Sequence, residues 1–136
     1  MRRFNLLAAG YEYPADNPEG YRRGHARVGE AIGSRRIGGT VYELPPGESA
    51  WPYHYELGDE EWLIVLDGGV AVRTPAGEEE LGRGDVVCFP EGPEGAHKMV
   101  NRGASDDGRF WGPIPVDWVI GGAFATYWPP KRIGIL

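Results

Sequence analysis

Short stretches of alternating polar and apolar residues, separated by turns rich in glycine and proline, fill the chain from residue 37 onward. Thr40–Leu44 is one such stretch, and Pro45-Pro46-Gly47-Glu48 ends it. A period of two is typical of strands that bury one face, and proline and glycine clusters commonly terminate them. The same pattern predicts further strands over residues 51–56, 61–66, 70–74, 78–81, 86–89, 96–101, 109–111, 118–120 and 123–128.

Eight or more short strands without an amphipathic helix predict an all-β fold, either a closed barrel or a jelly roll. Residues 1–36 show little periodicity, which predicts an irregular N-terminal arm with at most one short strand. Residues 37–136 are then the barrel, in a single domain overall. A chain of 136 residues is long enough to bury one core without disulfides or a structural metal.

Composition and charge narrow the range of partners. The 22 glycines and 12 prolines fit a turn-rich protein, while 41% hydrophobic content argues against disorder. A net charge of −6, with no block of lysine or arginine, disfavours nucleic acids and anionic membranes. We therefore expect a small-molecule ligand or substrate, with no nucleic acid and no membrane as partner.

Two further patterns bear on location and reactivity. The apolar stretch after Met1-Arg2-Arg3 is interrupted by Asn5 and ends at Gly10, which does not fit a signal peptide. No run reaches the roughly 18 apolar residues of a membrane span, so a cytoplasmic location is expected. Cys88, the single cysteine, lies in the apolar run 86–89, which predicts a buried and unreactive core thiol.

Candidate metal ligands gather in two segments. His54, Glu56 and Glu61 lie close together in sequence, and His97 follows about forty residues later. Alternation along the strand predicted for 51–56 places His54 and Glu56 on one face. Imidazole nitrogens and carboxylate oxygens are ligands for divalent metals such as iron, manganese, nickel and zinc. The sequence therefore predicts a metal site assembled from at least two strands.

Four further residues near the candidate ligands have a simpler interpretation than metal binding. Leu63, Val65 and Met99 share strand parity with the candidate ligands, and core packing is the simplest role for them. Asn101 ends the last of these strands, where it either bonds to the backbone of a turn or serves the site.

The two segments resemble the signature segments of the cupin superfamily, G-x5-H-x-H-x3,4-E-x6-G and G-x5-P-x-G-x2-H-x3-N. The match runs from Gly47 to Asn101 and retains Glu61-x6-Gly68, Gly84-x5-Pro90-x-Gly92 and His97-x3-Asn101. The resemblance implies a single cupin-type β-barrel, or double-stranded β-helix, that binds one divalent transition metal (Fe, Mn, Zn or Ni). The metal ligands it implies are His54, Glu56, Glu61 and His97.

This chain departs from the signature at the ligands. One extra residue separates Gly47 from His54, the loop before His97 is two residues longer, and Glu56 stands in the place of the second histidine. Three arrangements follow. The site has two histidines and two glutamates, or Glu56 turns away and leaves a triad of two histidines and one carboxylate, or no metal binds.

The resemblance implies a metal-dependent enzyme of the oxygenase, decarboxylase or isomerase class that acts on a small organic molecule in the barrel cavity. The alternative is a non-catalytic cupin that binds or senses a small ligand, with or without metal. No general acid or base is assignable from the sequence. Because small cupins often form dimers and residues 111–128 are rich in aromatics, a homodimer is expected.

Overall fold

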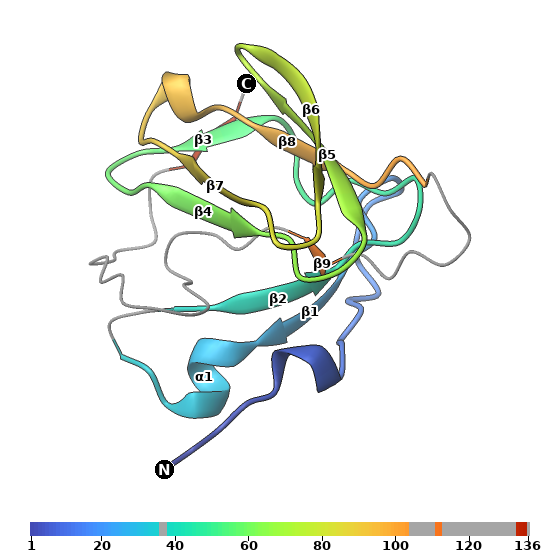
Figure 1. The fold of residues 1–136 in the computed structure, drawn as a ribbon, viewed down its shortest axis with the longest axis vertical. Coiled ribbons are helices and arrows are strands. Elements are labelled where there is room, and N and C mark those ends of the chain that lie inside the picture. Colours follow the sequence, from blue (N-terminus) through green and yellow to red (C-terminus); the bar gives the residue numbers. More distant parts are fainter. Residues whose placement is uncertain (36–37, 104–110, 113–132, 136) are drawn as a thin grey trace.

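Strands dominate the computed structural model, which describes residues 1–35, 38–103, 111–112 and 133–135 (Figure 1). The strands are β1 (Gly24–Arg27), β2 (Thr40–Glu43), β3 (His54–Glu56), β4 (Glu61–Ile64), β5 (Gly69–Thr74), β6 (Gly77–Gly82), β7 (Val86–Phe89), β8 (Lys98–Val100), β9 (Trp111–Gly112) and β10 (Ile133–Ile135). The helical segments are η1 (Leu6–Ala8), α1 (Val28–Ile32) and η2 (Pro93–Gly95).

The described strands form antiparallel sheets in the orders β1-β2-β9, β10-β3, β4-β7 and β6-β5-β8. Isolated bridges, Ser49↔Val100 and His54↔His97, connect the segment around β3 to the segment around β8. In Figure 1 the β5–β6 hairpin lies at one end of the molecule, and β1, β2 and α1 lie at the other. The all-β prediction is confirmed, although the described sheets do not join into one continuous closed barrel.

Most predicted strands are present, and several of them are shorter than expected. The strand predicted for 51–56 begins only at His54, because Pro52 has no N–H to donate to a ladder. The strand predicted for 96–101 begins at Lys98, directly after the turn of η2 and His97. The strands predicted for 118–120 and 123–128 lie outside the described residues.

The N-terminal arm holds more order than its sequence indicated. Its strand β1 pairs with β2 from Gly24↔Glu43 to Arg27↔Thr40, so the arm extends the sheet. The helix α1, which was not predicted, ends at Gly33 in the left-handed conformation, with φ 74°. Five residues are too few for a helical hydrophobic period to be recognised. Within the described residues, no helix has the length and apolar content needed to cross a bilayer.

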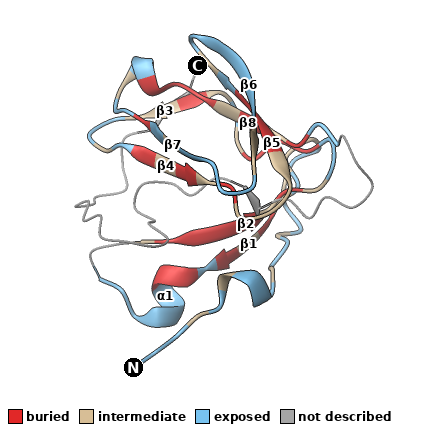
Figure 2. Ribbon diagram, viewed as in Figure 1, coloured by how far each residue is buried: buried red, intermediate tan, exposed pale blue. Residues whose placement is uncertain are grey.

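One hydrophobic cluster lies between the sheets, where the buried stretches of β4, β5 and β8 come together (Figure 2). Leu63, Val65 and Met99 are at most 1% exposed, as expected of core residues. The prediction that 61–66 is covered on both faces is wrong for the outer face, where Trp62 and Ile64 are only half-buried. The cluster comprises Leu44, Ala50, Leu63, Val65, Val70, Val72, Phe89 and Met99.

Cys88 is exposed, so the prediction of a buried core thiol is wrong. On β7 the buried side chain is Phe89, opposite Glu61 in the ladder, while Cys88 lies opposite Trp62 on the outer face. Successive strand residues point to opposite faces. An apolar run therefore does not ensure that each of its members is buried.

Asn101 has a structural role. Its side chain is fully buried, its amide donates to the Leu44 carbonyl at 2.8 Å, and its Oδ1 accepts from the Gly103 N–H at 2.8 Å. Its backbone carbonyl also accepts from the Gly47 N–H at 2.7 Å. Asn101 thus holds the turn after β2 against the end of β8.

Candidate metal site

His54 and His97 are direct cross-strand partners. The His54 N–H donates to the His97 carbonyl at 3.1 Å, and the His97 N–H donates to the His54 carbonyl at 2.8 Å. Residues that exchange both backbone hydrogen bonds place their side chains on the same face of the ladder. The imidazole centroids accordingly lie 4.6 Å apart. The register between two segments about forty residues apart therefore brings the histidines together.

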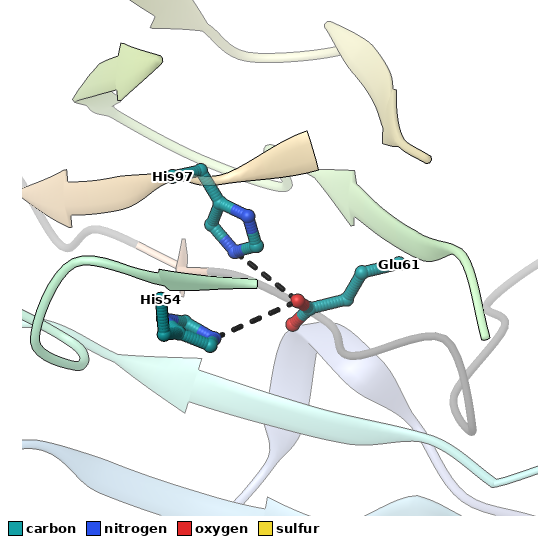
Figure 3. Close-up of side chains that lie close together, drawn as sticks. All are labelled: His54, Glu61 and His97. Atoms are coloured by element: carbon teal, nitrogen blue, oxygen red, sulfur yellow. Dashed lines mark ion pairs between the residues drawn. The ribbon is translucent and has the colours of Figure 1, made fainter. Parts of the chain in front are cut away.

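Glu61 reaches the same point from another sheet, at the start of β4 (Figure 3). Its Oε2 lies 3.1 Å from His97 Nε2 and 3.8 Å from His54 Nε2. The three residues are 6%, 2% and 1% exposed for His54, Glu61 and His97. Figure 3 shows the two rings and the carboxylate directed at one another from three segments.

Backbone carbonyls fix the tautomer of both rings. His54 Nδ1 lies 2.8 Å from the Pro52 carbonyl, and His97 Nδ1 lies 2.8 Å from the Gly95 carbonyl. A carbonyl oxygen only accepts, so each Nδ1 carries the proton that is donated. In the neutral rings Nε2 then keeps its lone pair, and it is Nε2 that faces Glu61. This is the arrangement by which proteins orient metal-binding histidines.

The three atoms that face one another, His54 Nε2, His97 Nε2 and Glu61 Oε2, all carry lone pairs. His97 Nε2 and Glu61 Oε2 are both buried, and the described residues offer neither of them a hydrogen bond. Burial lowers the pKa of His54 below its ordinary value, while the nearby Glu61 carboxylate acts in the opposite direction. A neutral imidazole and a carboxylate in contact leave two lone pairs opposed, which costs free energy unless a proton or a metal cation lies between them.

The residues present fit a divalent metal. Ligand atoms from His54, Glu61 and His97 all lie within 4.8 Å of one another. Two ligand atoms that each lie about 2.1 Å from one ion are roughly 3 to 4 Å apart at common coordination angles. The distances from Glu61 Oε2 to the two Nε2 atoms, 3.1 and 3.8 Å, fall in this range. Two histidines and one carboxylate are the ligand set that leaves open positions on non-haem iron.

Glu56 is not part of this group among the described residues. It is half-buried at the end of β3, and its backbone carbonyl accepts from the Gly92 N–H at 2.7 Å. Its role as a direct ligand stays a prediction. His25, outside the signature, is half-buried on β1 opposite Tyr42.

Sequence reasoning missed the residues that hold the histidines. Phe89 stacks on the His97 ring, with centroids 3.7 Å apart and an interplanar angle of 12°. The Pro52 and Gly95 carbonyls orient the rings, and each belongs to the residue two positions before its histidine. The repeated spacing is visible in the sequence, but only the backbone conformation makes it a hydrogen bond.

The architecture and the cluster together define a small all-β protein with a buried His-Glu-His group that is compatible with a metal site. The sequence matches the Cupin domain family over residues 40–111, which is more than half of the chain and includes all three clustered residues. The chain therefore belongs to the cupin family.

Solved structures with this fold include enzymes. A sugar phosphate isomerase of the cupin superfamily from Silicibacter pomeroyi is 24% identical, with a TM-score of 0.68, over 84% of this chain and 74% of that chain. The polyketide cyclase RemF from Streptomyces resistomycificus is 20% identical, with a TM-score of 0.62, over 88% of this chain and 87% of that one. At these identities the likeness establishes the fold alone.

Among curated proteins, the thylakoidal processing peptidase 1 of Arabidopsis thaliana chloroplasts is 27% identical over 115 residues, or 69% of this chain. The chain spans 32% of the length of that relative and 21% of the length of a second processing peptidase from the same plant. The activity in their names belongs to those proteins.

Proposed function

We propose that this cupin binds one divalent transition metal through His54, Glu61 and His97 and is a metal-dependent enzyme acting on a small organic molecule. The observation that carries the proposal is the convergence of the Nε2 atoms of two buried histidines on one buried carboxylate oxygen, with no hydrogen-bond partner for His97 Nε2 or Glu61 Oε2 in the described part of the chain. When bound, such a metal supplies Lewis-acid polarisation of a carbonyl or carboxylate, or activation of dioxygen.

The chain's own residues supply positioning and exclusion of water. The Pro52 and Gly95 carbonyls hold the two rings, and Phe89 covers one face of His97. The apolar core beneath keeps the local dielectric low, which strengthens each electrostatic interaction at the site. Three protein ligands leave coordination positions free for a substrate. Isomerase and cyclase cupins of the same fold support the enzyme assignment.

Metal content tests the proposal. Protein purified without an affinity tag is expected to contain close to one transition metal per chain by elemental mass spectrometry. His97→Ala removes one of three ligands, and even loss of an orienting partner lowers metal affinity about 10–100-fold, so we expect His97→Ala to be nearly empty. His25→Ala, which changes a histidine outside the cluster, is the matched control and keeps the metal. A metal-free wild type after reconstitution would contradict the proposal.

Two further measurements separate the alternatives. Glu56→Gln is expected to retain the metal if three ligands suffice, whereas a large loss would establish Glu56 as a fourth ligand. Azide added to cobalt(II)-substituted protein is expected to change the visible spectrum, because open positions accept an exogenous ligand. An unchanged spectrum would indicate a filled coordination shell and favour the non-catalytic binding protein.

A further inference from the structure

A cavity of about 420 Å³, partly open to solvent, lies between the β5–β6 hairpin and β7. Its volume falls within the range of small-molecule sites, about 300 to 1,000 Å³. Apolar side chains of Val72, Leu81, Val87 and Phe89 line it, and Glu79 and Glu94 add carboxylates. The two glutamates are exposed, while Val72 and Phe89 are buried, so the cavity has an apolar floor and an acidic rim.

The cavity shares a wall with the metal site. Phe89 lines the cavity and also stacks on the His97 ring at 3.7 Å. In the β4–β7 ladder, Phe89 lies opposite Glu61, and Val87 lies opposite Leu63. A molecule in the cavity therefore contacts the residue that packs directly on a proposed metal ligand.

The charges at the cavity are of one sign. Among the described residues that line it, Glu79 and Glu94 are the charged ones, and no lysine, arginine or histidine balances them. A concave apolar surface with charges of one sign concentrates ions of the opposite sign. An anion placed there lacks a counter-charge and loses its hydration.

We propose that this cavity binds a small molecule with an apolar body and a positively charged amine. The proposal needs no bound metal and does not depend on the proposed function. The apolar body lies on Val72, Leu81 and Phe89, and the ammonium group faces Glu79 and Glu94. Anionic molecules bind there more weakly, because the two carboxylates repel them.

Three probes of similar size and different charge test the proposal: benzylamine, benzyl alcohol and benzoate. Each is titrated into metal-free wild-type protein at pH 7 and low salt, with amide chemical shifts as the readout. We expect benzylamine to bind about tenfold more tightly than benzoate, with benzyl alcohol between them, a difference of about 1.4 kcal/mol. The largest shifts are expected at residues 79, 81, 87 and 94.

Variants of the rim identify the source of the preference. The double variant Glu79→Gln/Glu94→Gln is expected to reduce the preference for amine over benzoate severalfold. Glu80→Gln removes a neighbouring charge of β6 that does not line the cavity, and it is expected to keep the preference. Benzoate or benzyl alcohol binding as tightly as benzylamine, no binding of any probe, shifts confined to other residues, or an unchanged preference in the double variant would each overturn the proposal.

Binding to metal-free protein keeps this test separate from the metal assignment. If His97→Ala loses the metal and still prefers benzylamine, both claims stand. A wild type that takes up no metal and yet binds benzylamine selectively would overturn the proposed function and leave the amine cavity supported. A metal-loaded wild type with no preference for the amine would overturn the amine cavity alone.

Discussion

At the scale of single residues, the site depends on how two imidazole rings are held. Each ring donates Nδ1–H to the carbonyl two residues earlier and presents Nε2 to Glu61. The rings are therefore oriented by their own chain before any ligand arrives. Pre-orientation of this kind lowers the conformational entropy that binding would otherwise cost.

The burial of His54 predicts that metal-free protein loses stability in acid. Burial holds the His54 pKa below its ordinary value of about 6.5, so at pH values between the two the unfolded chain binds more protons than the folded one. The free energy of unfolding contributed by this group is present above pH 6.5 and decreases as the pH falls through the folded-state pKa. Urea unfolding of metal-free protein between pH 7.5 and 5 measures this slope.

The matched variants for this measurement are His54→Gln and His25→Gln. His54→Gln removes the titrating group and is expected to flatten the slope. His25→Gln changes a half-buried histidine outside the site and is expected to leave the slope in place. A steeper loss in His54→Gln than in wild type would show that the sign of the pKa shift is wrong.

At the scale of elements, the turn around η2 positions His97 for its contact with Glu61. Gly92 turns the chain with φ 79°, and its N–H donates to the Glu56 carbonyl at 2.7 Å. A Cβ on Gly95 would lie 1.8 Å from the Pro90 carbonyl oxygen. The loop therefore closes tightly between β7 and β8, and the Gly95 carbonyl is left directed at His97.

Gly95→Ala is expected to disturb both the loop and the metal site. The clash is with backbone, which cannot rotate away as a side chain can, so we expect a loss of about 1–3 kcal/mol in the free energy of unfolding. The shifted carbonyl would also release His97 Nδ1, with about a 10–100-fold loss of metal affinity. Urea unfolding and metal titration measure the two effects.

Gly10→Ala is the control for the loop variant, because a Cβ at Gly10 meets nothing within 4 Å. It is expected to change neither stability nor metal affinity measurably. If Gly95→Ala behaves like Gly10→Ala, the loop is not packed as described.

At the scale of the whole molecule, the larger hydrophobic cluster joins side chains of β4, β5, β7 and β8. Two positions of the β4–β7 pair show which side chains belong to this cluster and which do not. Leu63 is fully buried within the core, whereas Val86, one position further along the register and on the other face, is 51% exposed. Side chains on the inner face of this strand pair therefore contribute to the hydrophobic core, and those on the outer face do not.

Leu63→Ala is expected to reduce the free energy of unfolding by about 2–5 kcal/mol, because it removes buried methyl groups and leaves a cavity. Val86→Ala, on the same strand pair and outside the core, is expected to change it by less than about 0.5 kcal/mol. Urea unfolding of metal-free protein measures the change in the free energy of unfolding for each variant. Equal effects at the two positions would contradict the core described here.

The local pattern predicted much of the chain. Alternation predicted the strands from Thr40 to Val100, since a period of two requires no knowledge of the partner strand. The signature spacing also brought His54, Glu61 and His97 into one proposed site. The same pattern misplaced Cys88, because an apolar run does not reveal which face of β7 is covered.

Tertiary structure alone decided what surrounds those residues. The register that pairs His54 with His97, the stacking of Phe89 on His97 and the approach of Glu61 to both rings all depend on segments far apart in sequence. The cavity between β6 and β7 is likewise defined only when both strands are in place. Sequence determines periodicity and residue chemistry, because these are local; long-range pairing sets which side chains face one another.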